Sequence, residues 1–174
     1  MPRPLALLLA LAVVAVPGCG GTQTVTTTVT VTAPQELASP PEQRLYGHID
    51  SLRRAGDHYE LGFDPAWFLS GETANAAAAE DGAVEPGQPV PNDNYALDEG
   101  HRVLDYRVPP STAVTVITRH GNPEQLGATP IRVAELDRIL HGTGTVTLFE
   151  PLDSGVWVTV RNDTVERIDQ QYRP

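Results

Sequence analysis

The chain contains no lysine and a single cysteine. The lack of lysine limits its positive charge, and the single cysteine limits the covalent bonds that could stabilise its fold. All twelve basic residues are arginine, they face 22 acidic residues, and the formal net charge is −10. This excess of negative charge disfavours nucleic acid and anionic lipid headgroups, because binding them relies on clustered positive charge. Cations, cationic peptides and neutral glycans remain open as partners. Because Cys19 is the only cysteine, no disulfide can form within the chain, and an exported domain must be stable without one.

Long hydrophobic runs are also scarce, and the one that exists lies at the start. Residues 5–16 are all apolar, Arg3 precedes them, and no acid interrupts them. The run is shorter than the roughly 20 apolar residues needed to span a bilayer core. It has the length and flanks of the apolar region of a secretory signal peptide. The sequence therefore predicts export.

The run ends in Val16-Pro17-Gly18-Cys19. This segment resembles the lipobox of bacterial lipoprotein precursors, in which an aliphatic residue and two small residues precede a lipid-modified cysteine. The resemblance implies that residues 1–18 are a signal peptide and that the Cys19 sulfur carries a diacylglycerol. Two acyl chains would anchor the mature protein stably to a membrane. We therefore expect a lipid-anchored protein on the extracytoplasmic face of the cell membrane. The alternative is a secreted protein, cleaved after Ala15.

Residues 19–41 follow as the predicted lipidated cysteine and a tether. Residues 20–41 contain no arginine and one acid, Glu36, with threonines concentrated in residues 22–32 and prolines nearer the end. Such low complexity is typical of a flexible, solvated linker. Two alternatives stay open, namely an O-glycosylated stalk and an additional strand over residues 28–32. Residues 42–174 are predicted to form one globular domain, since about 130 residues can bury a core of their own.

The first part of this domain shows a hydrophobic period of two. Residues 44–52 and 59–63 alternate around a polar, glycine-containing segment, which predicts a β-hairpin with a turn over residues 53–57. Asp64-Pro65 is typical of a helix start and predicts one helical turn over residues 66–69, with Trp67 and Phe68 in the core. The alanine-rich segment 72–81, which precedes a glycine, predicts a short helix.

The second part contains further strands and one amphipathic helix. Thr129-Pro130 predicts the start of a helix that reaches Leu140, after a loop over residues 120–129. A strand is favoured over residues 164–172, with a helix as the alternative. The other predicted strands span residues 102–108, 113–118, 145–149 and 156–161.

These elements amount to six or seven strands with two or three short helices. No βαβ alternation occurs, so the sheet should be mostly antiparallel. We predict a mainly β or α+β fold, in the form of a small, partly open barrel of OB-like or SH3-like type. A two-layer α+β sheet is the alternative.

The region between residues 72 and 99 holds seven acids and no arginine. Hard cations such as Ca²⁺ need clustered oxygen ligands, which makes this acidic segment a candidate site. The spacing excludes an EF-hand, because the sixth position counted from Asn92 is Leu97 and not glycine. A solvated acidic loop is the competing interpretation. The candidate ligands are Glu80, Asp81, Asp93 and Asp98.

No catalytic motif is found in the chain. Asp153-Ser154-Gly155 lacks the G-x-S-x-G elbow of serine hydrolases and lies in a predicted turn. We therefore expect no catalytic residues and no cofactor, Ca²⁺ excepted. The expected function is that of a membrane-tethered, non-enzymatic envelope lipoprotein that binds an envelope protein or a wall polymer. The alternatives are an envelope hydrolase using carboxylates of residues 72–99 and a Ca²⁺-stabilised structural domain.

Overall fold

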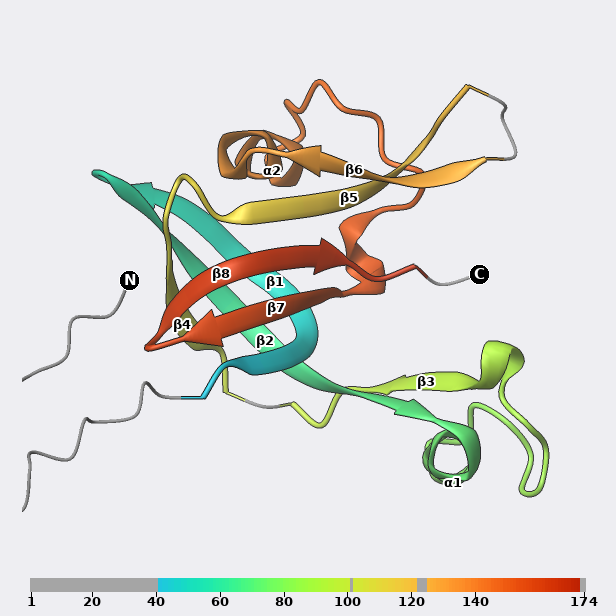
Figure 1. Ribbon diagram of the computed structural model, residues 1–174. Coiled ribbons are helices and arrows are strands. Elements are labelled where there is room, and N and C mark those ends of the chain that lie inside the picture. The colour runs from blue at the N-terminus through green and yellow to red at the C-terminus, as the bar shows by residue number, and fades with distance from the viewer. Residues whose placement is uncertain (1–40, 101, 122–124, 173–174) are drawn as a thin grey trace, which may run out of the picture. The chain divides into compact units, whose positions relative to one another are not determined.

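The computed structural model describes residues 41–100, 102–121 and 125–172 (Figure 1). The predicted signal peptide, Cys19 and nearly all of the tether lie outside the described residues. The strands are β1 (Gln43–Ala55), β2 (His58–Ser70), β3 (Asn94–Leu97), β4 (Leu104–Val108), β5 (Ala113–Arg119), β6 (Leu126–Ile131), β7 (Val156–Arg161) and β8 (Thr164–Gln170). The helices are α1 (Gly71–Glu80) and α2 (Val133–Leu140), with 3₁₀ turns at η1 (Pro91–Asp93) and η2 (Leu152–Ser154).

Five of these strands close into a mixed barrel. β1 pairs antiparallel with β2 and with β7, β2 pairs antiparallel with β4, and β7 pairs antiparallel with β8. The parallel pairing of Arg107 in β4 with Thr164 in β8 completes the ring. The order β1-β2-β4-β8-β7, with its third and fifth strands in sequence running parallel, is that of the OB-fold. The prediction of a small, mostly antiparallel barrel with short helices is confirmed, and the order of the strands matches its OB-like form.

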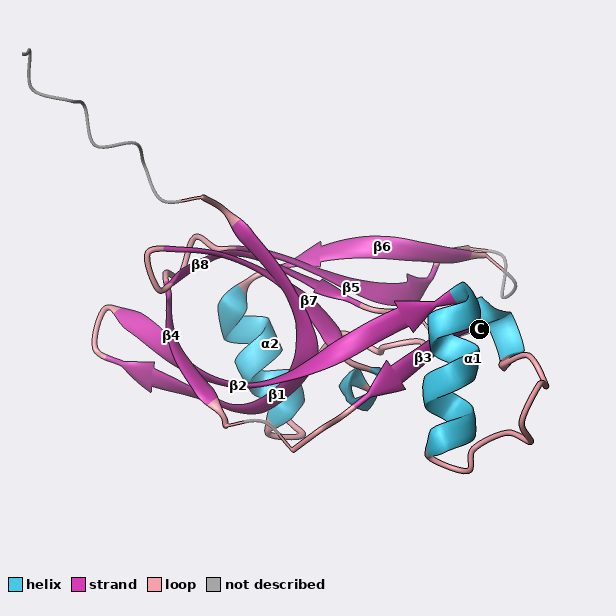
Figure 2. Cartoon of the chain, turned by 90° about the horizontal axis from the view of Figure 1, so that it is seen from below, coloured by secondary structure: helices cyan, strands magenta, loops and turns pink. Residues whose placement is uncertain are grey.

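The barrel is filled by the inward-facing half of each alternating strand. Leu61 and Phe63 of β2 and Val156 and Val158 of β7 are fully buried. The α2 helix lies across one end of the barrel (Figure 2) and adds Leu136 to the same core. Full burial of such a side chain contributes about 1.5–3 kcal/mol, so the alternation read in the sequence accounts for much of the stability of the barrel.

A small lobe extends from the long strand β2. Beyond the barrel, Trp67–Ser70 of β2 pair with β3, and α1 lies against this pair (Figure 1). The lobe has its own core of Ala74, Ala78 and Val90, separate from the barrel core. The alanine-rich helix was predicted correctly, because alanine has the highest helix propensity. The small side chains of α1 also let the helix pack closely against the strands.

The predicted helical turn over residues 66–69 is wrong. These residues continue β2, and Ser70 instead precedes the first residue of α1. Asp64-Pro65 carries a local preference for a helix start. The pairing of residues 67–70 with β3 supplies tertiary hydrogen bonds that outweigh it.

Three other parts of the chain also differ from the prediction. The first hairpin turns in two residues, Gly56 and Asp57, and not over residues 53–57. Part of the predicted loop 120–129 is β6, whose Thr129 and Pro130 pair with β5 and delay the helix to Val133. Residues 145–149 form no strand, because their polar groups bind elsewhere: Phe149 N–H donates to the Ile117 carbonyl. The strand chosen at residue 164 is confirmed as β8.

Candidate functional site

The four acidic candidates lie at three places in the chain of the small lobe, with Glu80 and Asp81 adjacent. Glu80 ends α1 and Asp81 follows it, Asp93 lies in η1, and Asp98 follows β3. The Tyr95 hydroxyl donates to Asp81 at 2.9 Å, and Gly100 N–H donates to Asp98 at 2.8 Å. Within the described ranges, no three His, Cys, Asp or Glu side chains gather as a metal site. The Ca²⁺ hypothesis stays a prediction.

The hydrolase alternative depends on two carboxylates that converge in a cleft. All seven acids between residues 72 and 99 are exposed. Exposed carboxylates are screened by water and are poorly suited to hold or to move a proton at neutral pH. The acidic segment therefore offers the hydrolase hypothesis no geometric support, and the hypothesis stays a prediction.

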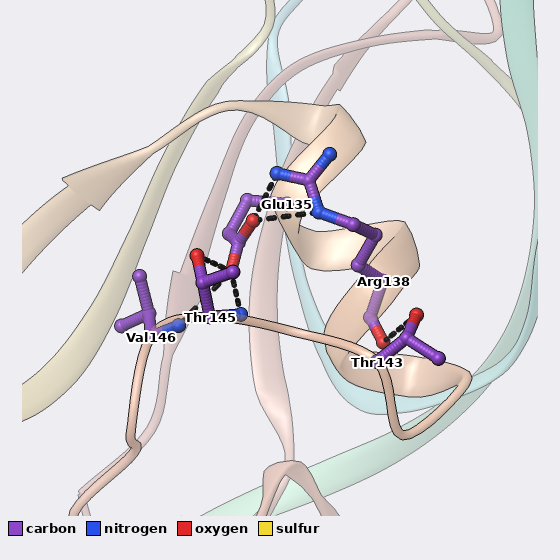
Figure 3. Close-up of polar contacts among 5 residues, drawn as sticks. All are labelled: Glu135, Arg138, Thr143, Thr145 and Val146. Carbon is purple, nitrogen blue, oxygen red and sulfur yellow. Dashed lines mark hydrogen bonds and ion pairs between the residues drawn. The ribbon is translucent and has the colours of Figure 1, made fainter.

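One buried carboxylate that the sequence did not single out is Glu135 of α2, which is 6% exposed (Figure 3). Its Oε1 accepts hydrogen bonds from Thr145 N at 2.5 Å, Thr145 Oγ1 at 2.9 Å and Val146 N at 3.0 Å. Its Oε2 accepts from Arg138. These donors, the Thr145 N–H foremost, lower the pKa of Glu135 to about 2. Because both oxygens are engaged, Glu135 fastens the chain after α2 and is not placed for proton transfer.

The most distinctive surface is an apolar groove where β1, β2 and β7 meet, here called the aromatic groove. It has a volume of about 380 Å³. The rings of Tyr46, Phe68 and Trp157 contact one another in it, with centroid distances of 5.0 to 5.6 Å. Its lining consists of Arg44, Leu45, Tyr46, Pro65, Ala66, Trp67, Phe68 and Trp157.

Strand pairing explains why these rings meet on the outside of the barrel. Tyr46 and Trp157 are direct cross-strand partners. The neighbours Leu45 and Val158 pack in the barrel core, so the two rings point outward. Cross-strand aromatic pairs of this kind contribute roughly 0.2–1 kcal/mol. The groove is therefore a product of the same alternation that builds the core.

Hydrogen bonds hold the rings in place. The Tyr46 hydroxyl donates to the Ser154 carbonyl at 2.8 Å, and the Trp157 indole N–H donates to Gln171 at 2.6 Å. The Arg44 guanidinium lies 4.6 Å from the Trp157 ring centroid, within the range of a cation–π contact. These contacts fix the orientation of the Tyr46 and Trp157 rings in the groove.

Trp67 is among the residues that line the aromatic groove, at its edge on β2. Its indole N–H donates to Glu99 at 3.1 Å, yet 54% of the residue is exposed. The prediction that Trp67 lies in the core is wrong, because it assumed a helical turn at this position. In the observed strand, Phe68 packs on Tyr46 and Trp157 and is partly buried, while Trp67 faces solvent. An exposed indole on an ordered surface is a feature of binding sites.

A second groove of about 540 Å³ continues from the aromatic groove. The two adjoin at Arg44 and Trp157, which line both, and together they make a track that runs from β1, β2 and β7 over β8 to β5 and β6. The second groove is more polar, and its lining includes Arg167, Asp169, Gln171 and Tyr172.

The outer face of β2 and β4 differs from this track. OB-folds often use the corresponding face for oligonucleotides and oligosaccharides. Here its charges pair with one another, and His58 and Arg107 both contact Asp57, at 2.7 and 3.4 Å. The His58 hydrogen bond and the Arg107 charge lower the pKa of Asp57. The shallow pocket on this face is lined by charged side chains and Tyr106.

No protein-family model matches the chain, and neither a curated protein nor a solved structure matches it. Among the helices that the structure describes, none is long and apolar enough to cross a membrane. The candidate site accordingly rests on geometry. A sequence signal for it did exist, because Arg44 and Tyr46 alternate with core residues in β1, as Trp157 does in β7.

Proposed function

We propose that this protein is a lipid-anchored module of the cell envelope that binds an extended wall glycan and catalyses no reaction. Cys19 would carry the anchor, and residues 20–41 would tether the barrel to the extracytoplasmic face of the membrane. The observation that carries the proposal is the aromatic groove with Trp67 exposed at its edge. Flat aromatic faces beside planar polar side chains suit sugar rings, which present both apolar C–H faces and hydroxyl groups.

The continuity of the two grooves favours a polymer over a small molecule. Because Arg44 and Trp157 line both, a chain-like ligand can pass from one groove to the other without leaving the surface. The charge of the ligand is constrained as well. Acidic residues outnumber basic ones by 22 to 12, which repels a polyanion at long range. A largely neutral glycan strand satisfies both constraints.

A binding assay with purified, insoluble cell wall tests this proposal. The full-length protein should co-sediment with the wall, and Trp67→Ala should weaken binding by about tenfold, equivalent to about 1.4 kcal/mol for one lost ring contact. Val103→Ala is the matched control, because Val103 is also exposed, at 37%, but lines neither groove.

Two outcomes would contradict the proposal. If Trp67→Ala and wild type bind the wall equally, the aromatic groove is not the site. If the wild-type protein does not bind the wall but retains a solubilised envelope protein, the ligand is a protein and not a glycan.

The anchor has a separate test. The wild-type protein should partition into a detergent phase, and Cys19→Ala should remain in the aqueous phase, because two acyl chains account for the difference. Equal partitioning of the two proteins would refute the lipid anchor and favour secretion.

A further inference from the structure

A third pocket, near the end of the barrel that α2 covers, carries three arginines on its wall. Arg54 comes from the end of β1, Arg132 directly precedes α2, and Arg167 lies on β8. The pocket has a volume of about 880 Å³. Among the described residues that line it, none is acidic. We call it the arginine pocket.

This concentration of positive charge is unusual in so acidic a chain. Four arginines elsewhere lie against carboxylates, since Arg53, Arg107, Arg138 and Arg161 each form an ion pair, while Arg44 and Arg119 lie over the rings of Trp157 and Phe149. In the part of the chain that the structure describes, neither Arg54 nor Arg132 has an acidic partner, and both are exposed. Arg167 contacts Asp169 at 2.7 Å through its Nε. The pocket therefore holds guanidinium groups whose charge is not neutralised locally.

The remaining wall of the arginine pocket is largely apolar. Tyr59 and Val114 are buried beneath it, and Ile131 is partly buried at its side. The hydroxyl of Thr112 is already engaged, because it donates to the Val165 carbonyl at 2.9 Å. Ser111 adds an exposed hydroxyl. A ligand that fits this wall has one negatively charged end and a compact, partly apolar body.

We infer that the arginine pocket binds a small organic oxyanion, a phosphate or carboxylate carried on a partly apolar body. The planar guanidinium fork matches two oxygens of either group, and such charge-assisted pairs are stronger than neutral hydrogen bonds. A volume of this size lies within the range of small-molecule sites. The net charge of −10 disfavours binding of a long polyanion. A small ligand with a single anionic group contacts only the basic pocket, so the same repulsion does not prevent its binding. The arginine pocket shares Thr115 and Arg167 with the second groove but no lining residue with the aromatic groove, and Arg54 and Arg132 line neither groove. Substitutions of Arg54 and Arg132 therefore test this site separately from the proposed function.

The test uses the full-length chain with Cys19→Ala, which removes the predicted acyl chains from vesicle experiments. Binding is measured by calorimetry and by the shift in melting temperature with four probes: inorganic phosphate, glycerol phosphate, hexanoate and phosphatidylglycerol vesicles. We expect at least one probe to bind and to raise the melting temperature. The double substitution Arg54→Gln with Arg132→Gln should weaken that binding by about tenfold or more.

Arg53→Gln is a matched control. Arg53 is the neighbour of Arg54 on β1 but points to the other face, where it contacts Glu60 at 3.9 Å. It should leave binding unchanged, as should Trp67→Ala. Circular dichroism confirms that each variant is folded, and Arg132→Gln alone replaces the double variant if the latter is not.

The tightest probe identifies the source of the oxyanion: a free anion, a soluble phosphate ester, a fatty carboxylate or a lipid headgroup. Binding by none of the four probes would overturn the inference. Equal binding to wild type and to the arginine variants would overturn it as well. Because Trp67→Ala tests only the aromatic groove, failure of one site does not imply failure of the other.

Discussion

Glu135 holds the chain after α2 through both of its carboxylate oxygens, which gives a pH-dependent contribution to stability. Its pKa in the folded protein is about 2, below the ordinary value of 4.5. A group with a depressed folded-state pKa stabilises the fold fully above its unfolded pKa, and the contribution is lost as the pH falls toward the folded value. The stabilisation by Glu135 is therefore complete above about pH 4.5 and fades between pH 4.5 and 2.

We expect Glu135→Gln to lower the melting temperature by a few degrees at neutral pH. The difference from wild type should shrink as the pH is lowered from 5 toward 2, because wild-type Glu135 then becomes protonated. Thermal unfolding followed by circular dichroism across this range measures both effects. Glu85→Gln, in the exposed loop of the small lobe, is the control. A difference that is constant with pH would show that the charge of Glu135 is not what stabilises the fold.

Position 155 requires glycine for two reasons, its backbone conformation and the close approach of Tyr46. Its φ of 94° is unfavourable for any residue with a side chain, and an added Cβ would lie 2.4 Å from the Tyr46 hydroxyl. Gly155→Ala should destabilise the fold by about 2–4 kcal/mol, the sum of backbone strain and overpacking. Gly56→Ala is the matched control, since Gly56 has a φ of 65° but no neighbour within 4 Å. Denaturant unfolding should show a clearly larger loss for Gly155→Ala, and equal losses would exclude the clash with Tyr46.

At the scale of elements, the small lobe should unfold separately from the barrel. Its core residues do not belong to the barrel core, and the far end of its long loop is joined to α1 by a hydrogen bond from Val90 N to the Asn75 side chain at 2.8 Å. Asn75→Ala leaves the buried Val90 N–H without this acceptor, at a local cost of about 1–3 kcal/mol. Hydrogen exchange should speed up in residues 71–97 while the amides of Leu61 and Val158 keep their protection.

The exposed loop residue Gln88 supplies a control for this prediction, because its side chain makes no hydrogen bond within the described part of the lobe. If Asn75→Ala also accelerates exchange throughout the barrel, the lobe and the barrel unfold as one cooperative unit and the prediction is wrong.

Elements whose stability comes from local alternation could be predicted from the sequence. The paired halves of β1 and β2 repeat with a period of two and are close in the chain, so the sequence indicates both their type and their pairing. β7 repeats in the same way, whereas the segment of β8 also fits a helical period, so its pattern alone does not decide between strand and helix. β3 could not be predicted, because Asn94–Leu97 become a strand only through contact with the end of β2. The same contact turned the predicted helical turn into a strand and placed Trp67 in solvent, so the error in the element hid the aromatic groove.

At the scale of the whole molecule, the closure of the barrel lies beyond what alternation can predict. The parallel contact between β4 and β8 joins residues far apart in sequence through one strand pair, Arg107 with Thr164. No local pattern in either segment encodes this partner. The arginine pocket depends on the same kind of assembly, because Arg54, Arg132 and Arg167 come to line one pocket only after the barrel, β6 and α2 are in place.

The turn between β7 and β8 bears on this closure. Asn162 and Asp163 both have positive φ, 49° and 55°, and the Asp163 carbonyl accepts a hydrogen bond from Arg107 N at 2.9 Å. Asp163→Gly keeps the carbonyl and removes the strain of a side chain in the left-handed region, and an Asn-Gly sequence is preferred in such two-residue turns. We expect a gain of up to about 1 kcal/mol in the free energy of unfolding, together with slower exchange of the Arg107 amide.

Asp163→Asn separates the backbone effect from the charge effect. Burial, and secondarily the charge of Asp163, raise the pKa of Tyr106, so both substitutions should lower that pKa toward its ordinary value in an ultraviolet titration. Only Asp163→Gly should also stabilise the fold in denaturant unfolding. Equal stability of the two variants would show that the turn is unstrained, and the contribution of this turn to barrel closure would then be limited to the Arg107 N–H bond to the Asp163 carbonyl.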